Sequence, residues 1–153
     1  MRWQFIDRIV ELDPGQRALG IKCFTRSEEF FQDHFPGMPI VPGVLQIEMM
    51  AQLAGKCLAQ SLDDILPVLA QVKSAKFYRN IRPGDQCFIR AELTKVTSSF
   101  ALADASIEVE GQKMSQASIM FGLIDRSQLS SESFDEVTQD FLRQKKKEKD
   151  SHG

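Results

Sequence analysis

The sequence has few of the residues that build metal sites, redox centres or disulfide frameworks. Its 153 residues include three cysteines, widely spaced and without a Cys-x-x-Cys pair. An odd number of isolated cysteines does not predict a disulfide framework, so we expect Cys23, Cys57 and Cys87 to be reduced and mostly buried. With only two histidines, the sequence offers no cluster of metal ligands. These features are typical of a cytoplasmic protein.

Long hydrophobic runs are also missing. No stretch reaches the roughly 18 apolar residues of a membrane span, and the start, Met-Arg-Trp-Gln-Phe-Ile-Asp, contains no hydrophobic signal core. We therefore expect no membrane association. A composition of 42% hydrophobic and 26% charged residues argues against disorder and against a fibrous class. The length predicts a single domain with a sizeable core.

A strong excess of positive charge is absent as well. The net charge is −2, and residues 141–153 alone hold five basic and two acidic side chains. The rest of the chain is therefore acidic, at about −5, which does not favour nucleic-acid binding. One local exception is a run of ten residues without an acid, and its basic members are Lys73, Lys76, Arg79 and Arg82. Such a run is either a solvated strand face or a basic rim for an acidic partner.

The most informative stretch of the sequence is residues 34–52. It begins as a rigid loop with three prolines, each of which fixes its own φ and restricts the residue before it. From Gly43 to about Leu62 the residues are strong helix formers and apolar on nearly every side. This pattern predicts a buried central helix on the order of 28 Å long.

Glu48 is the single carboxylate within the apolar part of that helix. None of its neighbours three or four positions away is a cation. A buried, unpaired carboxylate either finds a distant partner or takes up a proton. Gln52, one turn further on, lies on the same face and is able to orient it. The alternative, that Glu48 only marks the solvent edge of the helix, stays open at this point.

His34 is the one plausible imidazole base, because His152 lies in a charged stretch at the C-terminus. A lone histidine beside aromatic residues is often structural. Three features favour catalysis here: the rigid loop, its glycines, and an acid fourteen residues downstream near the start of a helix. The free N–H groups of Gly43 and Val44 at that helix start form a ready site for an oxyanion.

The string His-Phe-Pro-Gly-x-Pro-x-x-Pro-Gly-Val-Leu-x-x-Glu-x-x-Ala-Gln of residues 34–52 resembles the active-site motif of the (3R)-hydroxyacyl-acyl carrier protein dehydratases of the FabZ type. Residues 5–15 and 76–86 resemble the same family, in the same order. The resemblance covers about residues 3–125.

Six strands are predicted around the central helix. The first follows an aromatic entry within residues 3–12, and the others span residues 17–24, 68–78, 86–96, 99–109 and 112–123. Two strands, one helix and four strands indicate an α+β fold. With the resemblance, this is the hotdog fold, an antiparallel sheet wrapped around a central helix. We expect residues 1–125 to form this domain. Residues 126–153 form an extension, predicted to be a short amphipathic helix followed by a charged, disordered tail.

The resemblance implies dehydration of a (3R)-hydroxyacyl thioester to the trans-2-enoyl thioester, in fatty acid biosynthesis. The substrate is carried on the phosphopantetheine of acyl carrier protein, and no metal or redox cofactor is expected. His34 would take the proton from C2, and Glu48 would help the C3 hydroxyl leave as water. The substrate-binding residues would be Phe35, Pro42, Gly43, Val44 and Gln52.

The resemblance also implies partners. An acidic acyl carrier protein would be steered by the basic rim of Lys73, Lys76, Arg79 and Arg82. The family forms dimers through the sheets, with the histidine from one protomer and the helix acid from the other, and often trimers of dimers.

Two other functions stay open, and three positions depart from the usual pattern. One alternative is a hotdog acyl thioesterase, against which His34 argues. The other is a non-catalytic module that binds acyl carrier protein or acyl chains, against which the intact pair of His34 and Glu48 argues. Asp33 stands where many members have glycine and could pair with His34, while Gln46 and Met49 replace commoner small or aliphatic residues and could alter a substrate tunnel.

Overall fold

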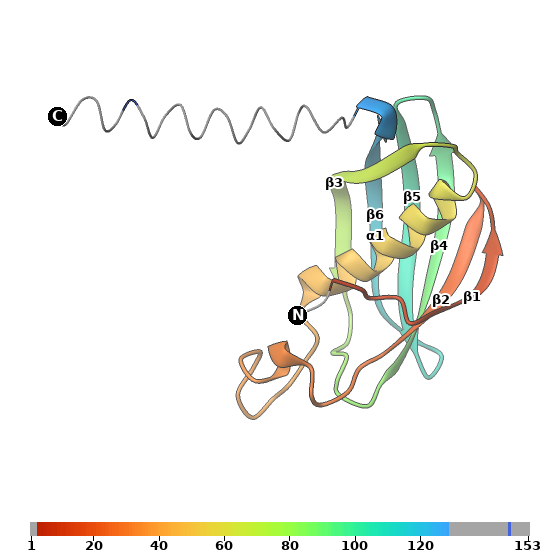
Figure 1. Ribbon diagram of the computed structural model, residues 1–153. Helices are drawn as coiled ribbons and strands as arrows, with labels where there is room; N and C mark the ends of the chain where they lie inside the picture. The colour runs from red at the N-terminus through yellow and green to blue at the C-terminus, as the bar shows by residue number, and fades with distance from the viewer. Residues whose placement is uncertain (1–2, 129–146, 148–153) are drawn as a thin grey trace.

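The computed structural model describes residues 3–128 and residue 147. These residues form one long α-helix packed against a six-stranded antiparallel sheet (Figure 1). The elements, in chain order, are β1 (Arg8–Asp13), β2 (Arg17–Cys23), η1 (Glu29–Phe31), α1 (Gly43–Ala59), β3 (Ile65–Phe77), β4 (Gln86–Val96), β5 (Phe100–Val109), β6 (Gln112–Asp125) and η2 (Arg126–Gln128).

The strands lie in the order β1-β2-β4-β5-β6-β3, and every neighbouring pair is antiparallel. β1 and β3 are therefore the two edges of the sheet. In Figure 1, α1 crosses one face of the strongly twisted sheet. The expected α+β architecture, a sheet wrapped around a central helix, is confirmed.

The core lies between α1 and the inner face of the sheet. The fully buried side chains of α1 are Met49, Met50, Leu53, Ala54, Cys57 and Leu58. Facing them, β4, β5 and β6 alternate buried and more exposed positions, as strands with one covered face do. β5 presents alanines at 101, 103 and 105, and these small side chains leave room for the helix.

The sequence predicts a helix that is buried on nearly every side, but α1 is partly exposed. Val44 is 72% exposed, Lys56 is exposed and Glu48 is half-buried. α1 also ends at Ala59 instead of near Leu62. Both the backbone N–H and the hydroxyl of Ser61 donate to the Leu58 carbonyl, and this tight turn stops the helix.

Two strand boundaries also differ from those predicted. β3 begins at Ile65 and includes Pro67, although the sequence placed Pro67 in a loop. Proline is tolerated there because β3 is an edge strand, where one side of the backbone needs no partner. β6 runs two residues further than predicted, to Asp125, whereas residues 3–7 precede β1, as the predicted aromatic entry before that strand implies.

Among the described residues, no helix is long and apolar enough to cross a membrane. The predicted C-terminal helix and charged tail lie outside the described residues, apart from residue 147.

Candidate active site

His34 lies in the loop between β2 and α1, and its ring is oriented by the backbone of the same loop. Its Nδ1 lies 3.2 Å from the carbonyl oxygen of Ile40. A carbonyl only accepts hydrogen bonds, so this contact places the proton of a neutral imidazole on Nδ1 and leaves the lone pair on Nε2. The half-buried ring also stacks on Phe35, with the ring centroids 3.9 Å apart. The geometry therefore presents Nε2 as a base.

The loop that carries His34 is fastened at three points. The His34 N–H donates to the Phe30 carbonyl at 2.9 Å, and the Ile40 N–H donates to the His34 carbonyl at 3.0 Å. Beyond them, the Val41 N–H donates to the Ile81 carbonyl at 2.8 Å, which ties the loop to the segment after β3. Beneath the loop, Phe31 is buried in edge-to-face contacts with Phe24 and Phe30. The loop is thus rigid without belonging to a helix or strand.

The first turn of α1 supplies free backbone donors. Gly43 and Val44 are its first two residues, so their N–H groups have no acceptor one turn earlier. Glycine at 43 allows a close approach of β3, because a Cβ there would lie 3.1 Å from the ring of Phe77 and would push that ring away. Pro42 precedes the helix, and its carbonyl accepts from Leu45 and Gln46. Among residues 3–128 the N–H groups of Gly43 and Val44 have no backbone acceptor, and their role as a site for an oxyanion stays a prediction.

Glu48, one turn into the helix, is half-buried and paired, so of the alternatives left open by the sequence the structure shows the distant partner. Its Oε1 accepts from the indole Nε1 of Trp3 and from the amide Nε2 of Gln52, both at 3.0 Å. The prediction that Gln52 orients Glu48 is confirmed by this contact. Trp3 was not predicted as the distant partner, because the sequence predicts only an aromatic entry followed by a strand over residues 3–12. Its signal in the sequence is that it is the only tryptophan of the chain.

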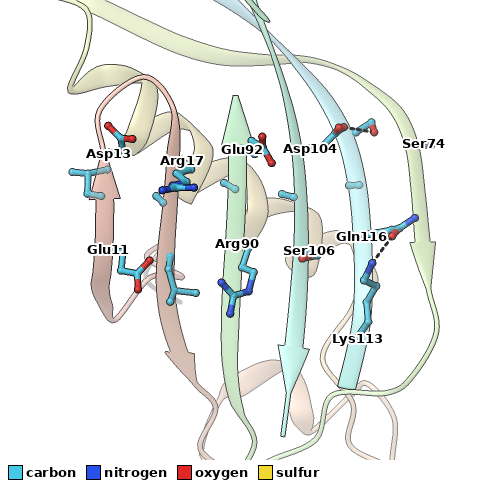
Figure 2. Close-up of a pocket in the computed structure, with 17 residues that line it drawn as sticks. Glu11, Asp13, Arg17, Ser74, Arg90, Glu92, Asp104, Ser106, Lys113 and Gln116 are labelled. Carbon is cyan, nitrogen blue, oxygen red and sulfur yellow. Dashed lines mark hydrogen bonds between the residues drawn. The ribbon is translucent and has the colours of Figure 1, made fainter. Parts of the chain in front are cut away.

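Within residues 3–128, His34 and Glu48 make no hydrogen bond or ion pair with each other. Among residues 3–128, His34 contacts its own loop, and Glu48 contacts Trp3 and Gln52. A hollow of about 640 Å³ lies instead on the sheet face away from α1 (Figure 2). It is lined by charged residues such as Arg17, Arg90 and Glu92, and contains none of the predicted catalytic or substrate-binding residues.

The four residues of the basic rim are all exposed. Lys73 and Lys76 lie on β3, and Arg79 and Arg82 follow in the connection to β4. None of the four forms an ion pair with another residue of the described part of the chain. Their charge is thus available at the surface, and a role in binding acyl carrier protein stays a prediction.

The comparisons with known proteins agree with the motif. A model of the ApeI-like family, described as ApeI dehydratase, matches residues 12–117. The 3-hydroxyacyl-[acyl-carrier-protein] dehydratase FabZ of Clostridium acetobutylicum is 42% identical over 122 residues, which are 78% of this chain and 86% of the relative. The chain belongs to the FabZ-type dehydratase family.

Solved structures support the fold. A chain of the dehydratase heterocomplex ApeI:P from Xenorhabdus doucetiae aligns with a TM-score of 0.61 and 20% identity, over 75% of this chain and 96% of that one. A hypothetical thioesterase with coenzyme A from Streptococcus pneumoniae aligns with a TM-score of 0.62 and 12% identity, over 77% and 85%. These neighbours establish the hotdog fold. Because they include a thioesterase, the fold alone does not choose the reaction.

The three departures from the usual FabZ pattern are placed as follows. Asp33 is exposed and, within residues 3–128, makes no hydrogen bond or ion pair with His34. Met49 is fully buried in the core. Gln46 is buried, and its Nε2 donates to the Val41 carbonyl at 3.2 Å. Its contact helps to hold the end of the His34 loop against α1.

Proposed function

We propose that this protein removes water from a (3R)-3-hydroxyacyl group carried on the phosphopantetheine of acyl carrier protein. The product is the trans-2-enoyl thioester, an intermediate of fatty acid biosynthesis. The observation that carries the proposal is the complete motif of a FabZ-type dehydratase. In it the His34 ring presents Nε2, and one oxygen of the Glu48 carboxyl has no partner among residues 3–128. Membership of the FabZ-type family supports the same reaction.

The proposed mechanism uses both side chains and the helix start. Neutral His34 takes the proton from C2 through Nε2, while the Gly43 N–H stabilises the negative charge on the thioester oxygen. Glu48 acts as the general acid and gives a proton to the C3 hydroxyl, which leaves as water while C2 and C3 form the double bond. Solvent then returns the two catalytic groups to their starting states. No electron is gained or lost by the substrate, so the reaction itself calls for no redox cofactor.

A second copy of the chain would bring the two catalytic groups together. β3 is a 13-residue edge strand, whose free side is able to pair with another strand. Apolar side chains are exposed along it and just beyond it, at Val68, Leu69, Val72, Phe77 and Tyr78. These features support a homodimer joined through β3, with His34 from one protomer and Glu48 from the other. A trimer of such dimers, and a cytoplasmic location, belong to the same proposal.

The test is reversible hydration of crotonyl thioester, offered on acyl carrier protein and on a small thiol. We expect wild-type turnover, with a loss of at least about 100-fold in His34→Ala and in Glu48→Gln, because each removes a proton-transfer group. Glu11→Gln, which changes an exposed glutamate of β1, is the matched control and should retain full activity.

Two results would overturn the proposal. Release of free thiol without hydration would indicate a thioesterase. Tight binding of acyl carrier protein with no turnover at any chain length would indicate a non-catalytic binding module.

A further inference from the structure

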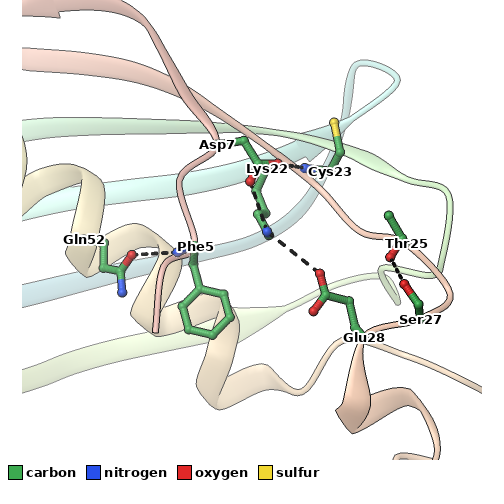
Figure 3. A network of polar contacts seen from close by, with 8 residues as sticks. All are labelled: Phe5, Asp7, Lys22, Cys23, Thr25, Ser27, Glu28 and Gln52. Atoms are coloured by element: carbon green, nitrogen blue, oxygen red, sulfur yellow. Dashed lines mark hydrogen bonds and ion pairs between the residues drawn. The ribbon is translucent and has the colours of Figure 1, made fainter. Parts of the chain in front are cut away.

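The segment of residues 3–7 lies against α1 and is fixed there from both sides. Phe5 and Ile6 are buried in the core. Asp7 fastens the segment to β2, since its Oδ2 accepts from the Cys23 N–H at 2.7 Å and its Oδ1 lies 3.1 Å from Lys22 Nζ (Figure 3). Trp3 packs edge-to-face on Phe5, with the ring centroids 5.4 Å apart. The indole is therefore held beside the helix although 58% of the residue is exposed.

Gln52 links this segment to Glu48, and hydrogen-bond chemistry dictates how its amide is oriented. Its Oε1 accepts from the Phe5 backbone N–H at 2.9 Å, as drawn in Figure 3. Because that partner is a donor, Oε1 must face it and the NH₂ group must face the other way. The NH₂ donates to the Trp3 carbonyl at 3.3 Å and to Glu48 Oε1 at 3.0 Å. One side chain thus fixes both the segment and the carboxyl.

The two oxygens of Glu48 have different surroundings. Oε1 accepts from the Trp3 indole N–H and from the Gln52 amide. Neither of these donors can accept a proton in return, so a proton on a neutral Glu48 has to sit on Oε2. Among residues 3–128, Oε2 has no hydrogen-bond partner. Within residues 3–128, the arrangement separates an oxygen that accepts two hydrogen bonds from one that is free to exchange a proton.

We propose that Trp3 is a positioning residue, whose indole N–H, together with Gln52, makes Oε2 of Glu48 the proton-donating oxygen. The inference rests on the proposed function and extends it to a residue outside the motif. When Oε2 gives its proton to the leaving hydroxyl, the negative charge spreads over both oxygens. The two N–H groups already aimed at Oε1 then become charge-assisted donors, which stabilises the carboxylate as it forms.

The first test is Trp3→Phe, which keeps an aromatic ring beside Phe5 and removes the N–H donor together with part of the indole ring system. We expect kcat to fall about tenfold with KM within about twofold, because the lost contact strengthens only as charge develops. Gln4→Ala, in the same segment and exposed, is the matched control and should leave both parameters unchanged. A fully active Trp3→Phe enzyme would overturn the inference while leaving the dehydratase proposal intact.

The second test does not depend on activity. Trp3 is the only tryptophan, so labelling with ¹⁵N-indole gives a single N–H resonance that reports on this contact. We expect Glu48→Gln to shift that resonance and Glu11→Gln to leave it in place. An indole N–H resonance that does not shift in Glu48→Gln would overturn the inference. If wild type is inactive on every thioester, the proposed function fails, whereas an indole that still responds to Glu48→Gln would confirm the contact itself.

Discussion

At the scale of single residues, the three thiols lie in different environments. Cys57 and Cys87 are fully buried, and Cys23 is exposed at the end of β2. Burial raises the pKa of the Cys87 thiol to about 12 and also raises the pKa of Cys57. The reactive species is the thiolate, so both buried thiols stay protonated and unreactive near neutral pH.

We therefore expect one of the three cysteines to be alkylated by iodoacetamide in the native protein, and mass spectrometry should place the label on Cys23. Raising the pH from 7 to 9 should not add a second label, because burial shields Cys57 and Cys87 from the reagent and the raised pKa of Cys87 keeps its thiol protonated. Cys23→Ser is the control and should abolish labelling. Rapid native labelling of Cys57 or Cys87 would contradict the packing of the core.

The catalytic candidates could be predicted from the sequence, but the contacts of Glu48 could not. His34 and Glu48 stand out because each is the single group of its kind in a rigid or apolar stretch. Trp3 lies 45 residues before Glu48, and nothing local in the sequence says that residues 3–7 leave the sheet and cross the helix. That path depends on the tertiary placement of Phe5 and Gln52.

At the scale of elements, the turn between β1 and β2 is joined to the C-terminal end of α1. Gly15 has a φ of +73°, and its N–H donates to the Cys57 carbonyl at 3.0 Å. A Cβ on Gly15 would lie 2.8 Å from the Cβ of Ser61, whose hydroxyl is itself bonded to the Leu58 carbonyl. These hydrogen bonds hold the turn and Ser61 in place, so they resist moving apart to make room for a Cβ on Gly15.

We expect Gly15→Ala to lower the free energy of unfolding by more than the roughly 1–2 kcal/mol that a left-handed backbone costs a residue with a side chain. Gly111→Ala is the matched control, because Gly111 has a φ of +75° and open space around its Cα. Urea unfolding of the two variants separates the clash from the backbone term. Equal destabilisation would contradict the close contact between the turn and Ser61.

The strands were predicted nearly completely, and their misplaced ends have physical causes. Alternating polarity located β4 and β5, which have one face on the core. It failed at the start of β3, because proline usually ends a strand and only the sheet order reveals that Pro67 lies on an edge.

At the scale of the whole molecule, the two edge strands β1 and β3 both expose apolar side chains, but only β3 is proposed to form the dimer interface. Val72 on β3 is 38% exposed and Ile9 on β1 is 37% exposed. We expect Val72→Glu to convert the assembly to a folded monomer and to abolish activity, because a charge buried in an interface without a partner is strongly unfavourable. Ile9→Glu should retain the wild-type mass and activity. Light scattering checks the masses, and an assembled, active Val72→Glu protein would contradict an interface at β3.

The most direct measurement is complementation between two inactive variants. His34→Ala and Glu48→Gln chains are unfolded together, refolded as an equal mixture, and assayed for hydration of crotonyl thioester. If each site takes His34 from one protomer and Glu48 from the other, half of the dimers are mixed and each has one intact site. The account then predicts about a quarter of wild-type activity from two inactive parents. A mixture as inactive as its parents would show that the two groups do not act across the dimer, and would contradict the account.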